Sequence, residues 1–287
     1  MRLILVLLLT LLAGTGSVPV REGTAHPARK VVMDRYLPEG DPVASVVVCP
    51  GGSYHWLDLD AEGAKVGQWL ADNGIAAYVL HYRVAGVPSF ITHYRLLLRG
   101  RRHPDMICDL QRAIRLVREE QTGPVGVMGF SAGGHLVLSA GEFAGTDFNR
   151  DGSPDGGSLR PDFIAAIYPV VTLTDERYVH KRSRKGLLGE TSRIPMRDSL
   201  SLERHVPADM PPVFLLNCTD DPIVDWHNSV LMDSALTAAG VPHRYVRYQR
   251  GGHGFGADPA KMGPETGAWQ NEFLEWFQQW KNDYDHD

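Results

Sequence analysis

Short apolar runs alternate with amphipathic stretches along most of the chain. The apolar runs are rich in β-branched and aromatic residues, which is typical of strands buried on both faces of a sheet. The predicted strands cover 43–49, 75–82, 125–128, 163–168, 213–218 and 244–248. Between them, apolar residues recur at helical spacing. The predicted helices lie around 61–73, 105–121, 132–143, 227–239 and 268–281. This alternation predicts an α/β fold, with a mostly parallel central sheet and helices on both faces.

The last predicted helix has an aromatic stripe. Helical spacing places five rings on one face, namely Trp269, Phe273, Trp276, Phe277 and Trp280. We expect this face to pack in the core, as such stripes usually do.

Two segments follow neither pattern. Residues 145–160 are rich in Gly, Asp and Ser, and residues 173–210 are polar with scattered apolar positions. Loops of this length are often lids or binding loops. No repeat and no low-complexity linker divides the chain, so we expect a single domain over 25–287.

The N-terminal residues have a pattern of their own. Met1 and Arg2 precede an apolar run over 3–12, and small residues follow as far as Ser17. The run is shorter than the ~20 residues that a membrane-spanning helix needs. We therefore predict a signal peptide over 1–17, cleaved near Gly16 or Ser17, and a secreted or periplasmic protein with no membrane association afterwards. An uncleaved signal anchor is the alternative, and it too leaves the domain outside the cytoplasm.

Composition narrows the class of protein. The 287 residues include 29 Lys and Arg against 34 Asp and Glu, a net charge of −5. No basic surplus points to nucleic acid, and 43% hydrophobic residues exclude a disordered chain. The three cysteines are scattered, with no C-x-x-C pair, which argues against both a disulfide framework and a zinc site. We expect them to be buried as small apolar residues.

The strongest chemical signal is a G-x-S-x-G motif over 129–133. An apolar strand precedes it and an apolar helix follows it. This is the strand, sharp turn and helix of a nucleophile elbow, which presents the serine hydroxyl above the sheet. Ser131 is therefore the predicted nucleophile.

A serine needs a base, and the elbow arrangement predicts an acid and then a histidine later in the chain. His253 lies between glycines after a predicted strand, and it is our predicted base. His135, one turn along the helix from Ser131, is expected to pack, while His55 precedes the serine and has the wrong chain order. Three carboxylates follow the strand that ends at 218, and any of them could lie near the base: Asp220, Asp221 and Asp225.

Acyl transfer also needs hydrogen-bond donors for the developing oxyanion. Ala132, directly after the nucleophile, is expected to supply one amide. The turn Pro-Gly-Gly-Ser-Tyr over 50–54 follows an early strand and is expected to supply the others, although Pro-Gly-Gly is also typical of a simple tight turn. The bulky Tyr54 and Trp56 in this loop suggest limited room for the acyl group, and hence short acyl chains.

These residues resemble a known family. The shared motifs include the turn over 50–54, His-Tyr-Arg over 81–83, the elbow over 126–135, Asp-Asp-Pro over 220–222 and Gly-Gly-His-Gly-Phe-Gly over 251–256. Together they resemble the α/β-hydrolase superfamily and, within it, the secreted acetyl xylan esterase and feruloyl esterase-like group. Two features depart from the family pattern, since Ser53 replaces a third glycine and the segment 145–160 is an insertion.

The resemblance implies a complete site. It implies an eight-stranded sheet, a triad of Ser131, Asp221 and His253, and no cofactor. It also implies an oxyanion hole formed by the amides of Gly52, Ser53 and Ala132. Asp221 is chosen because it begins an acid-x-x-Val turn that matches the family. Asp225 is better placed to accept from free amides at a helix start, and Asp220 is expected to point toward solvent or backbone.

The predicted function is a secreted serine carboxylesterase that removes short acyl groups, acetyl above all, from a carbohydrate or plant-polymer ester. Two alternatives stay open. One is a serine peptidase of the same fold, and the other is a non-catalytic carbohydrate-binding protein.

Two charged segments offer weaker signals. Residues 147–155 resemble the first half of a calcium loop, with oxygen ligands at Asp147, Asn149, Asp151 and Asp155. Position 158 is Ser where such a loop has Glu, so a solvated acidic turn is the favoured interpretation. The cationic run over 177–185 is interpreted as a solvated face, although it could contact acidic sugars.

Overall fold

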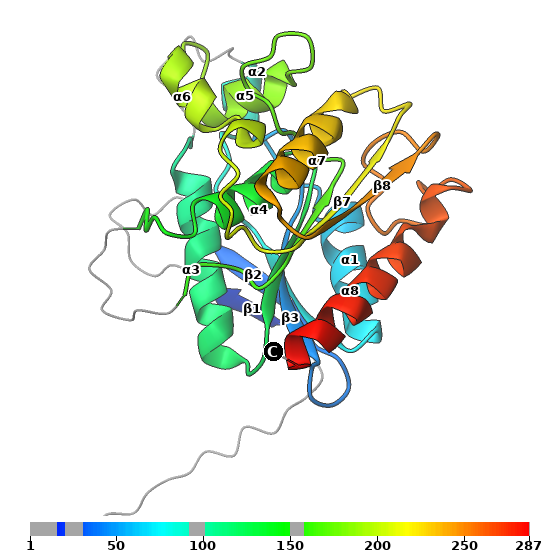
Figure 1. The fold of residues 1–287 in the computed structure, drawn as a ribbon. Coiled ribbons are helices and arrows are strands. Elements are labelled where there is room, and N and C mark those ends of the chain that lie inside the picture. The colour runs from blue at the N-terminus through cyan, green and yellow to red at the C-terminus, as the bar shows by residue number, and fades with distance from the viewer. Residues whose placement is uncertain (1–15, 21–30, 92–100, 150–157, 287) are drawn as a thin grey trace, which may run out of the picture.

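A computed structural model describes residues 16–20, 31–91, 101–149 and 158–286 (Figure 1). Its centre is an eight-stranded sheet of order β1-β2-β4-β3-β5-β6-β7-β8. The strands are β1 (Gly16–Pro19), β2 (Val32–Tyr36), β3 (Ala44–Cys49), β4 (Ile75–Leu80), β5 (Val125–Phe130), β6 (Ile164–Ile167), β7 (Val213–Cys218) and β8 (His243–Tyr248).

The six strands predicted from apolar runs, β3 to β8, are present and run parallel to one another. β1 and β2 were not predicted, and they add to the sheet in antiparallel orientation beside β4. Only Met33 of β2 is buried, so this strand lacks the apolar run that revealed the others. The sheet also starts at Gly16, before the expected domain start at 25.

Helices cover both faces of the sheet. The helices are α1 (Lys65–Asp72), α2 (Val87–Ile91), α3 (Asp105–Glu120), α4 (Ala132–Glu142), α5 (Lys181–Leu188), α6 (Ile194–Ser199), α7 (His227–Ala239) and α8 (Trp269–His286), with short π and 3₁₀ turns η1 (Asp60–Ala64), η2 (Leu202–Arg204) and η3 (Thr266–Ala268). Core residues of α3, α4 and α7 form one apolar cluster, and those of α1 and α8 form the other. The predicted α/β-hydrolase layering is therefore confirmed (Figure 1).

The aromatic stripe of α8 packs as expected. Trp269 and Phe273 are fully buried, and Trp276 and Phe277 nearly so. All three cysteines are free and buried, which confirms their predicted role as small apolar residues.

The order of the strands places the site. β3 lies between β4 and β5, so the chain leaves β3 in one direction along the sheet and reaches β5 in the other. Ligands of open α/β sheets bind in the crevice outside the carboxyl ends of the strands at such a switch point. The turn at 50–54 and Ser131 both follow strands that end here, where Cys49 pairs with Gly129.

The two irregular segments differ from each other. Residues 173–210 contain α5, α6 and η2, of which α5 and α6 lie with α2 above the carboxyl edge of the sheet in Figure 1. Residues 150–157 of the other segment, and the apolar run of the predicted signal peptide, lie outside the described residues. Within the described ranges, no helix has the length and apolarity that a membrane crossing requires.

Candidate active site

Ser131 lies at the sharp turn between β5 and α4. Its backbone has φ 54° and ψ −117°, a strained conformation for a residue with a side chain. A Cβ atom on Gly133 would lie 2.0 Å from the Cys49 carbonyl oxygen, and one on Gly129 would lie 2.2 Å from the Gly133 oxygen. The two motif glycines therefore allow α4 to begin directly against the ends of β3 and β5.

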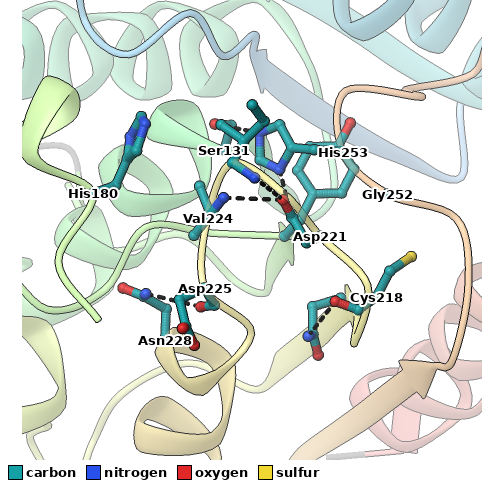
Figure 2. A network of polar contacts seen from close by, with 12 residues as sticks. Ser131, His180, Cys218, Asp221, Val224, Asp225, Asn228, Gly252 and His253 are labelled. Carbon is teal, nitrogen blue, oxygen red and sulfur yellow. Dashed lines mark hydrogen bonds and ion pairs between the residues drawn. The ribbon is translucent and has the colours of Figure 1, made fainter. Parts of the chain in front are cut away.

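A chain of hydrogen bonds joins Ser131 to two later loops (Figure 2). His253 Nε2 is 2.8 Å from Ser131 Oγ, and His253 Nδ1 is 2.6 Å from Asp221 Oδ2. The side chain of Asp221 is 1% exposed and that of His253 10%. With Nδ1–H donated to the carboxylate, Nε2 is free to accept the hydroxyl proton.

The three carboxylates of the β7 loop have different partners. Asp221 Oδ1 accepts from the amides of Ile223 and Val224, at 2.8 and 3.0 Å, which fixes the carboxylate that faces His253. Asp225 Oδ1 lies 2.9 Å from the amide nitrogen of His227, the first residue of α7, and 2.7 Å from its ring. The sequence left these carboxylates open until the family resemblance was considered, and the structure brings Asp221 to the base.

Asp220 holds the loop that carries the base. Its Oδ1 accepts from the amides of Gly251 and Gly252, at 3.0 and 2.9 Å. Asp220 therefore fixes the backbone just before His253 and does not contact the imidazole through any hydrogen bond in the described structure.

The turn after β3 has an unusual backbone. Gly52, Ser53 and Tyr54 have φ values of 132°, 56° and 62°. Within the described residues, the amides of Gly52, Ser53 and Ala132 donate to no acceptor. A Cβ atom on Gly51 would lie 2.8 Å from Ser131 Cβ, so this turn lies against the nucleophile. Free amides beside the serine are the donors that an oxyanion requires.

The sequence analysis missed Glu62 and Tyr168. Glu62 is 3% exposed, and its Oε2 accepts from the Gly51 amide at 2.6 Å. Its Oε1 accepts from the Tyr168 hydroxyl at 2.9 Å, which in turn accepts from the Gly256 amide at 3.0 Å. A lone glutamate in an amphipathic helical pattern has no sequence signature, because these partners are distant in the chain.

Tyr54 does not belong to the substrate-binding set. It is fully buried, and its hydroxyl lies 2.9 Å from His135 Nδ1. His135 Nε2 lies 2.9 Å from the Leu200 carbonyl oxygen, so it must donate there, and Nδ1 accepts from Tyr54. Burial lowers the pKa of His135 to about 4, which keeps this packed pair neutral. The expectation that His135 packs is thus met, and the expectation that Tyr54 limits the acyl pocket is wrong.

Trp56 remains at the surface beside the turn. It is 36% exposed, and its ring lies 5.7 Å from that of Phe90 in an edge-on arrangement. The guanidinium of Arg182, from α5, lies 5.9 Å from the Trp56 ring centroid. His55 is buried and bonds through Nδ1 to the Ser53 carbonyl oxygen at 2.9 Å. An aromatic surface therefore continues outward from the turn after β3.

His180 extends the site on the α5 side, and Figure 2 shows its ring across from Ser131. Burial, and after it positive charge on His253 and Arg182, lowers its pKa to about 4. His180 is therefore neutral near pH 7 and able to hydrogen-bond a substrate hydroxyl.

The calcium candidate at 147–155, which the sequence analysis ranked below a solvated acidic turn, lies only partly within the described residues. Asp147 pairs with Arg115 at 2.8 Å, and its other oxygen accepts from the Asn149 amide. Asp151 and Asp155 lie outside the described residues. No group of three or more His, Cys, Asp or Glu side chains in the described part of the chain could hold a metal.

Comparison with known proteins agrees with this geometry. The BD-FAE family matches residues 33–236. An acetylxylan esterase from Xylanibacter ruminicola is 30% identical over 239 residues, 79% of this chain and 44% of that protein. Endo-1,4-beta-xylanase B from Butyrivibrio fibrisolvens is 30% identical over 73% of this chain and 32% of that protein. The chain thus spans less than half the length of these curated relatives.

Solved structures show the same fold. An acetyl ester-xyloside bifunctional hydrolase from Caldicellulosiruptor lactoaceticus is 31% identical, with a TM-score of 0.80 over 94% of this chain and 97% of that one. A thermophilic esterase from Thermogutta terrifontis shares only the fold, at 20% identity and a TM-score of 0.70, over 92% of this chain and 91% of that one. With the family match covering most of its length, the chain belongs to the BD-FAE family and has the α/β-hydrolase fold.

Proposed function

We propose that the protein is a secreted serine carboxylesterase that removes short acyl groups, acetyl above all, from a carbohydrate or plant-polymer ester. The hydrogen-bonded chain from Ser131 through His253 to Asp221 carries this proposal, together with three nearby backbone amides that have no acceptor in the described part of the chain. Two similar proteins, an acetylxylan esterase and an acetyl ester-xyloside hydrolase, support the choice of an acetylated xylan as substrate. Secretion rests on the N-terminal sequence pattern alone.

The geometry supports a double-displacement mechanism. Ser131 attacks the ester carbonyl while His253 Nε2 takes the hydroxyl proton, and Asp221 stabilises the imidazolium that forms. The amides of Gly52, Ser53 and Ala132 donate hydrogen bonds to the carbonyl oxygen as it becomes negatively charged. Loss of one such donor typically raises the activation free energy by about 3 to 4 kcal/mol. His253 then protonates the leaving alcohol, and water, activated by the same base, frees the acyl group.

The decisive test is Ser131→Ala with a fluorophosphonate label. The wild-type protein should form one adduct at Ser131 and hydrolyse nitrophenyl acetate and acetylated xylan. The variant should do neither, with an unchanged melting temperature, because the hydroxyl serves chemistry more than packing. Absence of an adduct on the wild-type protein would favour the carbohydrate-binding alternative, and faster cleavage of peptide amides than of esters would favour a peptidase.

A substrate series tests the acyl group. Acetyl, butyryl and octanoyl nitrophenyl esters, acetylated xylan and a feruloylated sugar should rank with acetyl esters first. A preference for octanoyl esters would contradict the short-chain proposal, which no longer has the support of Tyr54, since that ring is buried.

A further inference from the structure

Glu62 and Tyr168 link two of the loops that the reaction needs. Gly51, whose amide donates to Glu62, precedes the proposed oxyanion amides of Gly52 and Ser53. Gly256, whose amide donates to Tyr168, lies three residues after His253. One buried carboxylate and one phenol therefore connect the oxyanion turn to the base loop.

The contacts are close and leave little freedom. A Cβ atom on Gly51 would lie 2.7 Å from Glu62 Oε2, and one on Gly256 would lie 2.1 Å from the Ala61 carbonyl oxygen. The Gly256 carbonyl also accepts from Trp269 Nε1 at 2.9 Å, which anchors the base loop to α8. Neither loop can shift without moving the other.

The direction of the hydrogen bonds indicates that Glu62 is ionised when the site is assembled. The Gly51 amide can only donate, so Oε2 must accept. The Tyr168 oxygen already accepts from Gly256, so its proton is directed to Oε1. Both carboxylate oxygens then accept, and a proton on Glu62 would remove one of these bonds.

Several charged or titratable groups surround this carboxylate. Burial raises the pKa of Glu62, a positive charge on His253 lowers it, and Asp58 raises it. Burial is the main cause that raises the pKa of the Tyr82 and Tyr168 phenols, and the negative charge of Glu62 raises both further. The Tyr168 ring itself lies 4.6 Å from the His253 ring, between centroids. A negative charge on Glu62 and a positive charge on His253 therefore attract each other, with no hydrogen bond between the two side chains in the described structure.

We infer that Glu62 is a positioning residue for the proposed esterase reaction: it holds the oxyanion turn through Gly51, and its negative charge attracts the positive charge that His253 gains during the reaction. Tyr168 connects Glu62 to the base loop, because its hydroxyl donates to Glu62 and accepts from the Gly256 amide. The inference rests on the proposed function. Glu62 thus affects the reaction rate from outside the hydrogen-bonded chain of Ser131, His253 and Asp221.

Glu62→Gln separates charge from shape. The Gln side chain keeps the shape of Glu and can still accept from the Gly51 amide, while the negative charge is lost and the amino group replaces the acceptor of the Tyr168 hydroxyl. Because the transition state carries an imidazolium, we expect kcat to fall roughly 10-fold, about 1.4 kcal/mol, with little change in KM. The acid limb of the kcat/KM profile should move to lower pH, because His253 loses a stabilising negative charge.

Two further variants complete the experiment. Asp60→Asn removes an exposed carboxylate from the same short helix, one that bonds Lys65, and it should change neither kcat nor the pH profile. Tyr168→Phe leaves the Gly256 amide without its acceptor and should lower kcat while Glu62 keeps its charge. It also provides a test if Glu62→Gln folds poorly.

Rates should be expressed per active site, counted by fluorophosphonate adduct. If Glu62→Gln and Tyr168→Phe lose only thermal stability or active fraction, with wild-type kcat and acid limb per active site, Glu62 is merely structural and the inference is overturned. If the wild-type protein forms no adduct, the proposed function fails instead, so the two failures are distinguishable.

Discussion

Two glutamates whose carboxyl oxygens are buried, Glu62 and Glu142, have very different surroundings. Glu62, at the carboxyl edge of the sheet, has a donor on each oxygen, from Gly51 and Tyr168. Glu142, the last residue of α4, has no hydrogen-bond partner on either oxygen within the described residues. Burial raises the pKa of both, and for Glu142, where Glu203 adds a like charge, it reaches about 9.

The two carboxyl groups differ in whether protein donors replace the water that burial removes. At the carboxyl edge, backbone amides and hydroxyls replace the water that burial removes, so charges can be used there for chemistry. At the end of α4 no group among the described residues replaces that water, so Glu142 holds its proton and reduces stability at neutral pH. We therefore expect that removing a carboxylate at the carboxyl edge of the sheet lowers activity, and that removing the Glu142 carboxyl group raises stability.

Asp221→Asn should give the largest effect, because it removes the charge that faces His253 and can present an amide donor in place of the acceptor. In a serine protease the equivalent change lowers kcat by ~10⁴, and we expect a loss of roughly 10³ to 10⁴ here. Steady-state kinetics on nitrophenyl acetate will measure it.

Asp220→Asn and Asp225→Asn are the matched controls, since an Asn oxygen can still accept from the backbone amides that these residues bind. Each should lose less than roughly 10-fold in kcat. If Asp220→Asn is the most damaged of the three variants, Asp221 is not the acid.

Glu142→Gln should stabilise the protein by about 1 to 3 kcal/mol at pH 7. In the unfolded chain Glu142 has its ordinary pKa of 4.5, whereas burial in the folded protein raises the pKa to about 9. Folding stability therefore falls as pH rises between these values, and removing the group removes that loss. Urea unfolding at pH 4 and pH 8 should show a gain that is near zero at the lower pH and larger at the higher.

Glu119→Gln, an exposed change on α3, serves as the control and should show no pH-dependent gain. Equal gains for Glu142→Gln at both pH values would mean that burial of the charge is not the cause. Esterase activity per active site should not change in either variant.

Tyr54→Phe should have the smallest effect. It leaves His135 Nδ1 without its donor and should cost about 1 kcal/mol of stability. Since the Tyr54 ring is fully buried, the relative rates on acetyl and octanoyl esters should stay the same. A changed acyl preference in a Tyr54→Phe variant would return this residue to the substrate pocket.

The sequence by itself determined the parallel part of the sheet, the helices that cover it and the position of the nucleophile, because these depend on local features. β3 to β7 are buried, mostly apolar runs, and β8 has tyrosines and a valine among charged residues. Ser131 lies in a motif whose glycines are needed within five residues of chain. His253 could be chosen for the same reason, since glycines flank it after a predicted strand. β1, at the edge of the sheet, and its neighbour β2 escaped prediction because neither contains an apolar run, and Met33 is the one buried residue of β2.

Only the tertiary structure decided which side chains meet. It buried Tyr54 against His135, gave Asp220 to the backbone of the base loop, and brought Glu62 between Gly51 and Tyr168. Glu62 and Tyr168 are 106 positions apart, and no local pattern records such a pairing. A buried polar group depends on the donors that folding places around it, and the same type of residue can therefore support catalysis at position 62 and reduce stability at position 142.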